Sequence, residues 1–391
     1  MKRTEVVAPP SGKVQQIVTC LLEPRSLGDR PGFSGGQLGP FLFLYAYARH
    51  TGCPVAAAAA QQRLLTAVTH LLALASGPTY YRELGEFGTL LLYLHAQDYL
   101  DESFDPLLAQ VEVRAGKGLR QLTQQPQFDP FVGYLALAPY YLRRGDEAPL
   151  HLLADALLRD YRAQPGGKTG YWYSYLFGKC QLYLGWSHGL AAILLFLTQL
   201  LATGFTYRRA ELQQALAGAA HYLLLPQVVT GPNYYPDIVG QARPSQTLNL
   251  CYGDLGTGFA LLQAAHILAD EELRQHALRT LCQAAARRDP AQCNVFDASF
   301  IYGASGNALV FKSLRHLHPA FGTAAGYWYE QAQQLSQHPA QVAGYQGHHN
   351  RHVASAHYSL FEGLAGFGLV LLEFESSLLT VLPLLGYPSC L

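Results

Sequence analysis

The stretch CYGDLGTGFALLQAA, residues 251–265, shows how this chain begins its helices. Gly253 follows two bulky side chains and precedes a long apolar run whose only charged residue is Asp254. The apolar residues of this run do not keep to one side, a pattern typical of a helix that is buried all round. The stretch therefore predicts an interior helix that starts at a glycine.

The same pattern recurs along the whole chain. Its glycines follow one another at intervals of 48 to 64 residues, enough for two helices and two loops in each repeat. Repeats of this length indicate a stacked or closed array of similar units. The stretches are 33–48, 81–96, 129–142, 186–200, 251–265, 301–314 and 360–374, and their glycines are Gly36, Gly85, Gly133, Gly189, Gly253, Gly303 and Gly363.

Amphipathic segments lie between these glycine-centred stretches. Apolar residues there recur at helical spacing, which favours helices with one buried face. We predict that they form an outer ring around the buried helices: an all-α, seven-fold α/α toroid in a single domain, residues 1–391. The glycines would let neighbouring helix ends approach closely, which would offset the ~1 kcal/mol that glycine costs in a helix. The faces expected to be buried are Leu64, Leu65, Val68, Leu71 and Leu72 in one segment and Leu273, Ala277, Leu278 and Leu281 in another.

The composition narrows the classes of function. The 27 basic residues balance the 27 acidic ones, so charge gives no reason to expect nucleic acid as a partner. The seven cysteines form no Cys-x-x-Cys pair, which argues against a disulfide framework or a zinc ribbon. Residues 1–20 show no long apolar core followed by a small-residue cleavage site, so we expect a cytoplasmic protein without a secretion signal. The most apolar stretch, residues 189–205, falls short of the ~20 residues of a membrane span and is expected to be a buried helix.

In a ring of this kind, the loops that enter the inner helices open at one end of a central cavity. Residues just before the glycines are then expected to face one another although they are far apart in sequence. Several of them are polar or reactive, so the chemistry is expected at this opening. They are Glu83, Asp129, His188, Cys251, Tyr252, Ile301, Tyr302 and Glu362.

Several of these motifs together resemble the lanthionine synthetase C (LanC-like) family. They are FSGGQLG (33–39), GWSHGL (185–190), LCYGDLGTG (250–258), DASFIYGASGNA (297–308), SLFEGLAGFGLVLL (359–372) and SLLTVLPLL (377–385). The resemblance implies an α/α toroid that adds cysteine thiols to dehydrated Ser or Thr residues of a ribosomally made peptide, forming lanthionine-type rings. It also implies a zinc ion held by the Cys of a Cys-Tyr-Gly motif and by the Cys and His of a Cys-His-Gly motif.

The match to these motifs is partial at the metal site. Cys251 and Tyr252 lie on the Cys-Tyr-Gly motif, but Ile301 and Tyr302 stand where the family has Cys and His. Cys251 is thus the lone retained ligand. A catalytic zinc needs about three protein ligands, so we expect that zinc, the cofactor of the family, is not bound here. The family often has Arg four residues before the first zinc ligand, and this chain has Thr247.

The resemblance also implies a proton-transfer role for His188, with Asp129 at an acidic position of the third repeat and Tyr252 as a hydrogen-bond donor. Each residue has a plainer alternative. His188 can be a core histidine, and Asp129, followed by a proline, can be a helix N-cap. Tyr252 is one of 25 tyrosines.

Two further motifs precede the last repeat. His348 and His352 stand four residues apart and could share a helix face and replace zinc ligands, or they are surface histidines of a polar loop. Ser359 and Glu362 form a Ser-x-x-Glu pattern, for which a capping box is favoured over a catalytic role.

Three functions remain open. The first is an active LanC-like cyclase with an unusual site, acting on a peptide substrate with a dehydratase as partner. The second is a non-catalytic relative that binds a peptide beside an active enzyme. The third is a glycoside-processing enzyme that uses two carboxylates from Glu83, Asp129, Asp254 or Glu362.

Overall fold

The computed structural model describes residues 10–23, 30–74, 77, 79–176, 178–225, 235–241 and 246–376. Helices dominate this part of the chain. The chain divides into two compact units. Unit 1 comprises Met1–Ala75, Phe296–Leu309 and Ala325–Val381, and unit 2 comprises Ser76–Val295, Val310–Ala324 and Leu382–Leu391. A single domain over the whole chain stays a prediction, and the motif at 377–385 lies outside the described residues.

Unit 1 is built around two buried helices. α2 (Leu38–Thr51) is buried from Leu38 to Ala46 and packs against α3 (Pro54–Ala73) and α14 (Leu364–Ser376). α14 is buried continuously from Leu364 to Leu372. α1 (Gly12–Leu22) contacts α14, and two 3-10 turns, Val342–Gly344 and Ala356–Tyr358, complete the unit. The boundary between the units falls within α12 (Ala304–Leu314) and α13 (Pro319–Gln334).

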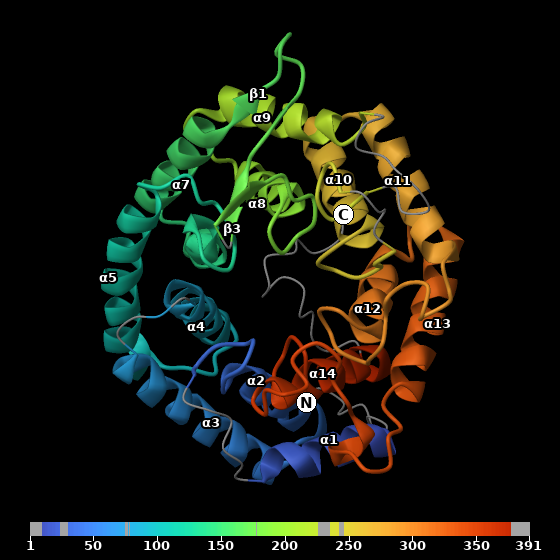
Figure 1. Ribbon diagram of the computed structural model, residues 1–391. Coiled ribbons are helices and arrows are strands. Elements are labelled where there is room, and N and C mark those ends of the chain that lie inside the picture. The colour runs from blue at the N-terminus through green and yellow to red at the C-terminus, as the bar shows by residue number, and fades with distance from the viewer. Residues whose placement is uncertain are drawn as a thin grey trace, which may run out of the picture. The chain divides into compact units, whose positions relative to one another are not determined.

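Unit 2 alternates buried and amphipathic helices, with α5, α7, α9 and α11 lying outside α4, α8 and α10 (Figure 1). The run of residues 189–205 contains α8 (Leu190–Ala202), which is buried along nearly its whole length, as predicted. The helices are α4 (Tyr80–His95), α5 (Asp105–Leu122), α6 (Ala138–Arg144), α7 (Glu147–Asp160), α8 (Leu190–Ala202), α9 (Arg209–Tyr222), α10 (Asp254–Leu268) and α11 (Glu271–Ala286), with 3-10 turns at Glu102–Phe104 and Tyr134–Leu137.

Unit 2 also contains two short β-hairpins, which were not predicted from the sequence. β1 (Arg162–Ala163) pairs antiparallel with β2 (Gly170–Tyr171), and β3 (Ser174–Leu176) pairs antiparallel with β4 (Lys179–Gln181). Strands of two or three residues are too short to display an alternating pattern. The second hairpin leads directly into the loop that carries His188.

The predicted buried faces of the amphipathic helices are partly correct. In α11 the buried residues include Leu273, Ala277 and Leu281. In α3 the prediction was wrong for Leu65 and Leu72, which are 47% and 44% exposed. Alanines complete the buried face of α3 instead, because a helix packed closely against its neighbour has room only for small side chains. That face is Ala56, Ala60, Leu64, Ala67 and Leu71.

Six of the seven repeat glycines lie one or two residues before a helical segment, as predicted. Gly85 is the exception: α4 already begins at Tyr80, so this glycine lies inside the helix. A Cβ atom at Gly85 would stand 2.7 Å from the carbonyl oxygen of Ala136. The glycine is therefore needed for contact with a neighbouring turn rather than for starting the helix.

The other repeat glycines are required mainly by their own loops. A Cβ at Gly133 would lie 2.2 Å from the carbonyl oxygen of Gln127, and one at Gly189 would lie 2.4 Å from that of Tyr183, six residues earlier in each case. The backbone N–H that follows Gly189 donates to the same Tyr183 oxygen at 3.1 Å. The chain thus folds back on itself. A side chain at the glycine would push apart the two backbone segments that meet in the loop. Gly36 with Arg30 and Gly303 with Asp297 make the same contact.

Candidate active site

A histidine–aspartate pair joins two loops of unit 2. Nδ1 of His188, just before α8, lies 2.6 Å from Oδ2 of Asp129. The Asp129 side chain is fully buried, whereas that of His188 is 21% exposed. An ionised carboxylate only accepts hydrogen bonds, so the neutral imidazole tautomer that fits this contact has its proton on Nδ1 and its lone pair on Nε2. The pair therefore presents a basic nitrogen on a partly exposed ring.

Asp129 also shapes the turn that holds it. Its Oδ1 accepts hydrogen bonds from the backbone N–H of Phe131 at 2.7 Å and of Val132 at 3.1 Å. The carboxylate thus caps a turn and not a helix, which differs from the N-cap alternative, and it reaches His188 with its other oxygen. The turn leads into the 3-10 segment Tyr134–Leu137 rather than directly into an α-helix.

Aromatic rings surround His188. The ring of Phe131 lies 5.5 Å from the imidazole, that of Tyr183 5.9 Å and that of Tyr252 6.5 Å, between ring centroids. Trp186 packs edge-on against Phe131 at 5.7 Å. The sequence reasoning missed Phe131 and Trp186, although each stands two residues from a predicted site residue. This wall limits access of water to one side of the imidazole.

The Cys251 turn lies beside the His188 loop. The backbone N–H groups of Cys251 and Tyr252 both donate to Oδ1 of Asn249 at 2.9 Å. Gly185 fits closely against this turn, because a Cβ there would stand 1.9 Å from the carbonyl oxygen of Cys251. The predicted residues of the third, fourth and fifth repeats, from Asp129 to Tyr252, therefore do come together within unit 2.

Tyr252 keeps its proton in this setting. Burial is the main cause that raises its pKa above the usual value, and the nearby Cys251 and Asp237 add to the effect. Because the phenol is neutral at ordinary pH, it can donate a hydrogen bond but cannot act as a base. Cys251 itself is fully buried.

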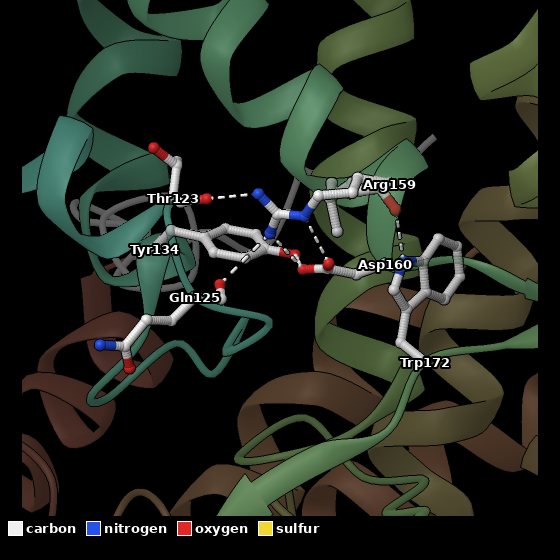
Figure 2. A network of polar contacts seen from close by, with 7 residues as sticks. Thr123, Gln125, Tyr134, Arg159, Asp160 and Trp172 are labelled. Carbon is white, nitrogen blue, oxygen red and sulfur yellow. Dashed lines mark hydrogen bonds and ion pairs between the residues drawn. The ribbon is translucent and has the colours of Figure 1, made fainter.

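A polar network fixes the chain on either side of Asp129 (Figure 2). The guanidinium of Arg159 forms two hydrogen bonds with the carboxylate of Asp160, at 2.7 and 2.8 Å, and also donates to the carbonyl oxygens of Thr123 and Gln125. The hydroxyl of Tyr134, which follows the Asp129 turn, donates to Asp160 at 3.1 Å. The end of α7 therefore anchors both ends of the segment that presents Asp129.

Ile301 and Tyr302 lie in unit 1, in the turn before α12. Ile301 is buried, and its N–H donates to the carbonyl oxygen of Phe361 at 2.9 Å. The Tyr302 ring packs on that of His349 with centroids 4.2 Å apart. An isoleucine side chain has no donor atom for a metal, so this position cannot supply a ligand.

The histidine loop of unit 1 does not form the helix face considered above. Residues 346–355 form turns, a bend and irregular segments, and the side chains of His348 and His352 are exposed. The N–H of His348 donates to Oδ2 of Asp297 at 2.7 Å, and that of Asn350 donates to Glu362 at 3.2 Å. Because carboxylates take these N–H groups, they are not available for helical hydrogen bonds.

The Ser-x-x-Glu pattern forms half of a capping box. The Ser359 hydroxyl accepts from the N–H of Glu362 at 3.0 Å. The Glu362 carboxylate instead accepts from the Asn350 side chain at 2.6 Å. Among the described residues, no group of three or more His, Cys, Asp or Glu side chains is placed to hold a metal ion.

The remaining predicted carboxylates accept hydrogen bonds inside unit 2. Glu83 is 3% exposed and accepts from the Thr79 hydroxyl at 3.0 Å. Asp254 is fully buried and accepts from the N–H of Tyr235 at 3.1 Å. A glycosidase needs two carboxylates that reach the sugar at a set separation, and this alternative stays a prediction.

Comparison with solved structures gives the fold class. The chain is similar to nisin cyclase with a TM-score of 0.71 and 17% sequence identity, over 93% of each chain. The predicted all-α, α/α-toroid class is thereby confirmed. Within the described residues no helix has the length and apolar character to cross a membrane.

A comparison with models of protein families identifies the family of the chain. The model of the lanthionine synthetase C-like protein family matches residues 29–385, and the chain belongs to this family. A comparison with curated proteins finds no match.

Proposed function

We propose that this protein is a lanthionine-cyclase-like enzyme in which His188 and Asp129 handle the proton of the substrate thiol. The 2.6 Å bond between these two residues carries the proposal. Membership of the family supports chemistry of this class. The proposed substrate is a ribosomally made peptide that contains a cysteine and a dehydrated Ser or Thr, supplied by a dehydratase partner in the cytoplasm.

The proposed reaction is balanced in protons. Nε2 of His188 takes the proton from the substrate thiol, and the thiolate sulfur bonds to Cβ of the dehydrated residue. The electron pair of the Cα–Cβ double bond moves to form an enolate, which then takes the same proton back at Cα from the imidazolium. Asp129 holds Nδ1–H throughout and stabilises the imidazolium, while neutral Tyr252 donates a hydrogen bond near the site. General acid–base catalysis of this kind is worth roughly 10²–10⁴ in rate.

We propose that this activity proceeds without the zinc ion and the three zinc ligands of the family. The family positions for Cys and His hold Ile301 and Tyr302, and Cys251 offers one sulfur where about three protein ligands are needed. A free thiol has a pKa of about 8.5, so a base beside it can raise the thiolate fraction at neutral pH.

The test is a thiol-loss assay on a synthetic peptide with one cysteine and one dehydroalanine. Cyclisation leaves the mass unchanged, so the remaining thiol is counted by alkylation and mass spectrometry. We expect His188→Gln to lower the rate by ~100-fold or more. His221→Gln is the matched control, because His221 also bonds an aspartate, Asp270, at 2.9 Å and lies on α9. Equal rates for the wild type and His188→Gln would contradict the proposal.

A non-catalytic peptide-binding role is the second candidate. The replacement of two family ligands by Ile301 and Tyr302 favours it. It predicts that the wild type binds the same peptide without consuming its thiol, and that His188→Gln leaves binding unchanged.

A further inference from the structure

The ring of Phe131 contacts both the imidazole of His188 and the guanidinium of Arg82. Its centroid stands 5.5 Å from that of the imidazole. Cζ of Arg82, on α4, lies over the same phenyl ring at 5.0 Å from its centroid. Neither Phe131 nor Arg82 takes part in the proton transfers proposed above, so their place beside His188 needs another reason.

The bond between His188 and Asp129 fixes the imidazole at one point only. Nδ1 lies 2.6 Å from Oδ2 of Asp129, but the ring can still tilt about this contact. A tilt moves Nε2, and a general base must lie within hydrogen-bond reach of the proton that it takes. A second contact, against the ring itself, is therefore needed to hold the direction of Nε2.

Phe131 is held well enough to supply that contact. Its backbone N–H donates to Oδ1 of Asp129 at 2.7 Å, and Trp186 packs edge-on against its ring at 5.7 Å. A guanidinium over an aromatic ring is attracted to it, and Arg82 is itself fixed by an ion pair with Glu86 at 3.4 Å. Both side chains of that pair are 11% exposed.

One short turn thus provides two contacts with the imidazole. Asp129 and Phe131 are two residues apart, and Oδ1 of the carboxylate binds the N–H of Phe131 while Oδ2 binds the imidazole. The rings of Tyr183 and Tyr252 lie farther from His188, at 5.9 and 6.5 Å. Phe131 is therefore the ring best placed to set the tilt of His188.

We propose that Phe131 and Arg82 are positioning residues that hold Nε2 of His188 toward the substrate thiol. Phe131 sets the tilt of the imidazole, and Arg82 holds Phe131 in place. The inference rests on the proposed function, in which this nitrogen is the base.

Steady-state kinetics of thiol loss give the first test. Phe131→Leu stays apolar but removes the flat ring, so kcat should fall ~10-fold with KM within ~2-fold, because misplacing a reacting group costs rate rather than binding. Phe131→Tyr keeps the ring and should stay within ~2-fold of the wild-type kcat. Arg82→Gln loosens Phe131 and should lower kcat ~3-fold.

Unit 2 offers a matched control for each change. Phe205 packs against His151 at 5.6 Å, nearly the distance between Phe131 and His188. The guanidinium of Arg143 lies over the ring of Tyr93 at 5.8 Å. Phe205→Leu and Arg143→Gln should leave kcat unchanged.

Imidazole ¹⁵N NMR of histidine-labelled protein tests the positioning without the reaction. The His188 signals are assigned by their loss in His188→Gln, at about pH 8, where a histidine of ordinary pKa is neutral. The wild type should carry the proton mainly on Nδ1. In Phe131→Leu a tilted ring bonds Asp129 less well, so the tautomer with the proton on Nε2 should gain population.

The two tests separate this inference from the proposed function. A wild type that consumes no thiol defeats the proposed function, and the ¹⁵N spectra then decide whether Phe131 orients His188. If the wild type is active, an unchanged kcat in Phe131→Leu overturns the inference. A raised KM with unchanged kcat also overturns it, because Phe131 would then bind substrate rather than position the base. Identical ¹⁵N spectra for the wild type and Phe131→Leu overturn it as well.

Discussion

The turn that carries Asp129 and the turn that carries Ile301 and Tyr302 share one construction. In both, an aspartate Oδ1 accepts a backbone N–H two residues ahead, at 2.7 Å from Asp129 and 2.9 Å from Asp297. In both, a glycine packs against backbone six residues earlier. The repeated scaffold is thus set by a few small and capping residues.

The two turns differ in what the second carboxylate oxygen binds. Oδ2 of Asp129 holds the imidazole of His188, whereas Oδ2 of Asp297 accepts the backbone N–H of His348. One turn orients a titratable ring and the other orders a loop. The turn is therefore built in the same way in both places, and what differs is the group that the second carboxylate oxygen binds.

The largest expected effect is the conversion of the second turn into a metal-binding one. Ile301→Cys with Tyr302→His supplies the two ligand types that the family motif has there, and we expect about one zinc per chain where the wild type has none. Inductively coupled plasma mass spectrometry measures the metal. A folded double variant that stays metal-free would contradict the alignment of the motif.

The shared scaffold predicts equal costs for its two glycines, Gly133 and Gly303. Gly133→Ala and Gly303→Ala each force a Cβ to within 2.4 Å of other atoms, so each should lower the free energy of unfolding by about 3 kcal/mol in urea titrations. Gly326→Ala in α13 is the control, since nothing lies within 4 Å of its Cβ, and it should gain about 0.5–1 kcal/mol. Only Gly133→Ala, in the turn that carries Asp129, should also slow thiol loss. A clear inequality between the two loop variants would break the comparison.

Asp129 does more than cap a turn, and its removal should show this. Asp129→Ala is expected to cost about 2 kcal/mol of unfolding free energy, because it leaves buried N–H groups and the imidazole without a partner. Asp289 caps Ala291 and Gln292 in the same way at 3.0 and 3.2 Å but is exposed and bonds no histidine. Asp289→Ala should cost about 0.5–1 kcal/mol. Equal costs would mean that the bond to His188 adds nothing to stability.

The smallest effect is a pH dependence in unit 1. Burial raises the pKa of Glu362 above its usual value, and Asp297 adds to this, while Asn350 acts in the opposite direction. A carboxyl group with a raised folded pKa binds more protons in the folded state, so stability falls as pH rises from the unfolded to the folded pKa and is level above it. Glu362→Gln should remove this slope. Urea midpoints measured from about pH 4 to about pH 8 would show it.

The sequence predicted most of the fold because seven glycine-centred repeats leave few arrangements that bury their helices. It also named His188 and Asp129, which the structure joins. The β-hairpins were not predicted, because their strands are too short to show a period. The exposure of Leu65 and Leu72 was not predicted either, because spacing alone cannot tell which face of α3 packs. The ring of Phe131 beside His188 was missed for a similar reason: contacts between loops depend on turn geometry that residue types do not reveal.

The most direct test is the zinc content of the wild-type protein, purified without chelator from cells grown with added zinc. The account predicts well under one zinc per chain, together with thiol loss that depends on His188. A stoichiometric zinc ion that survives extensive dialysis would contradict it.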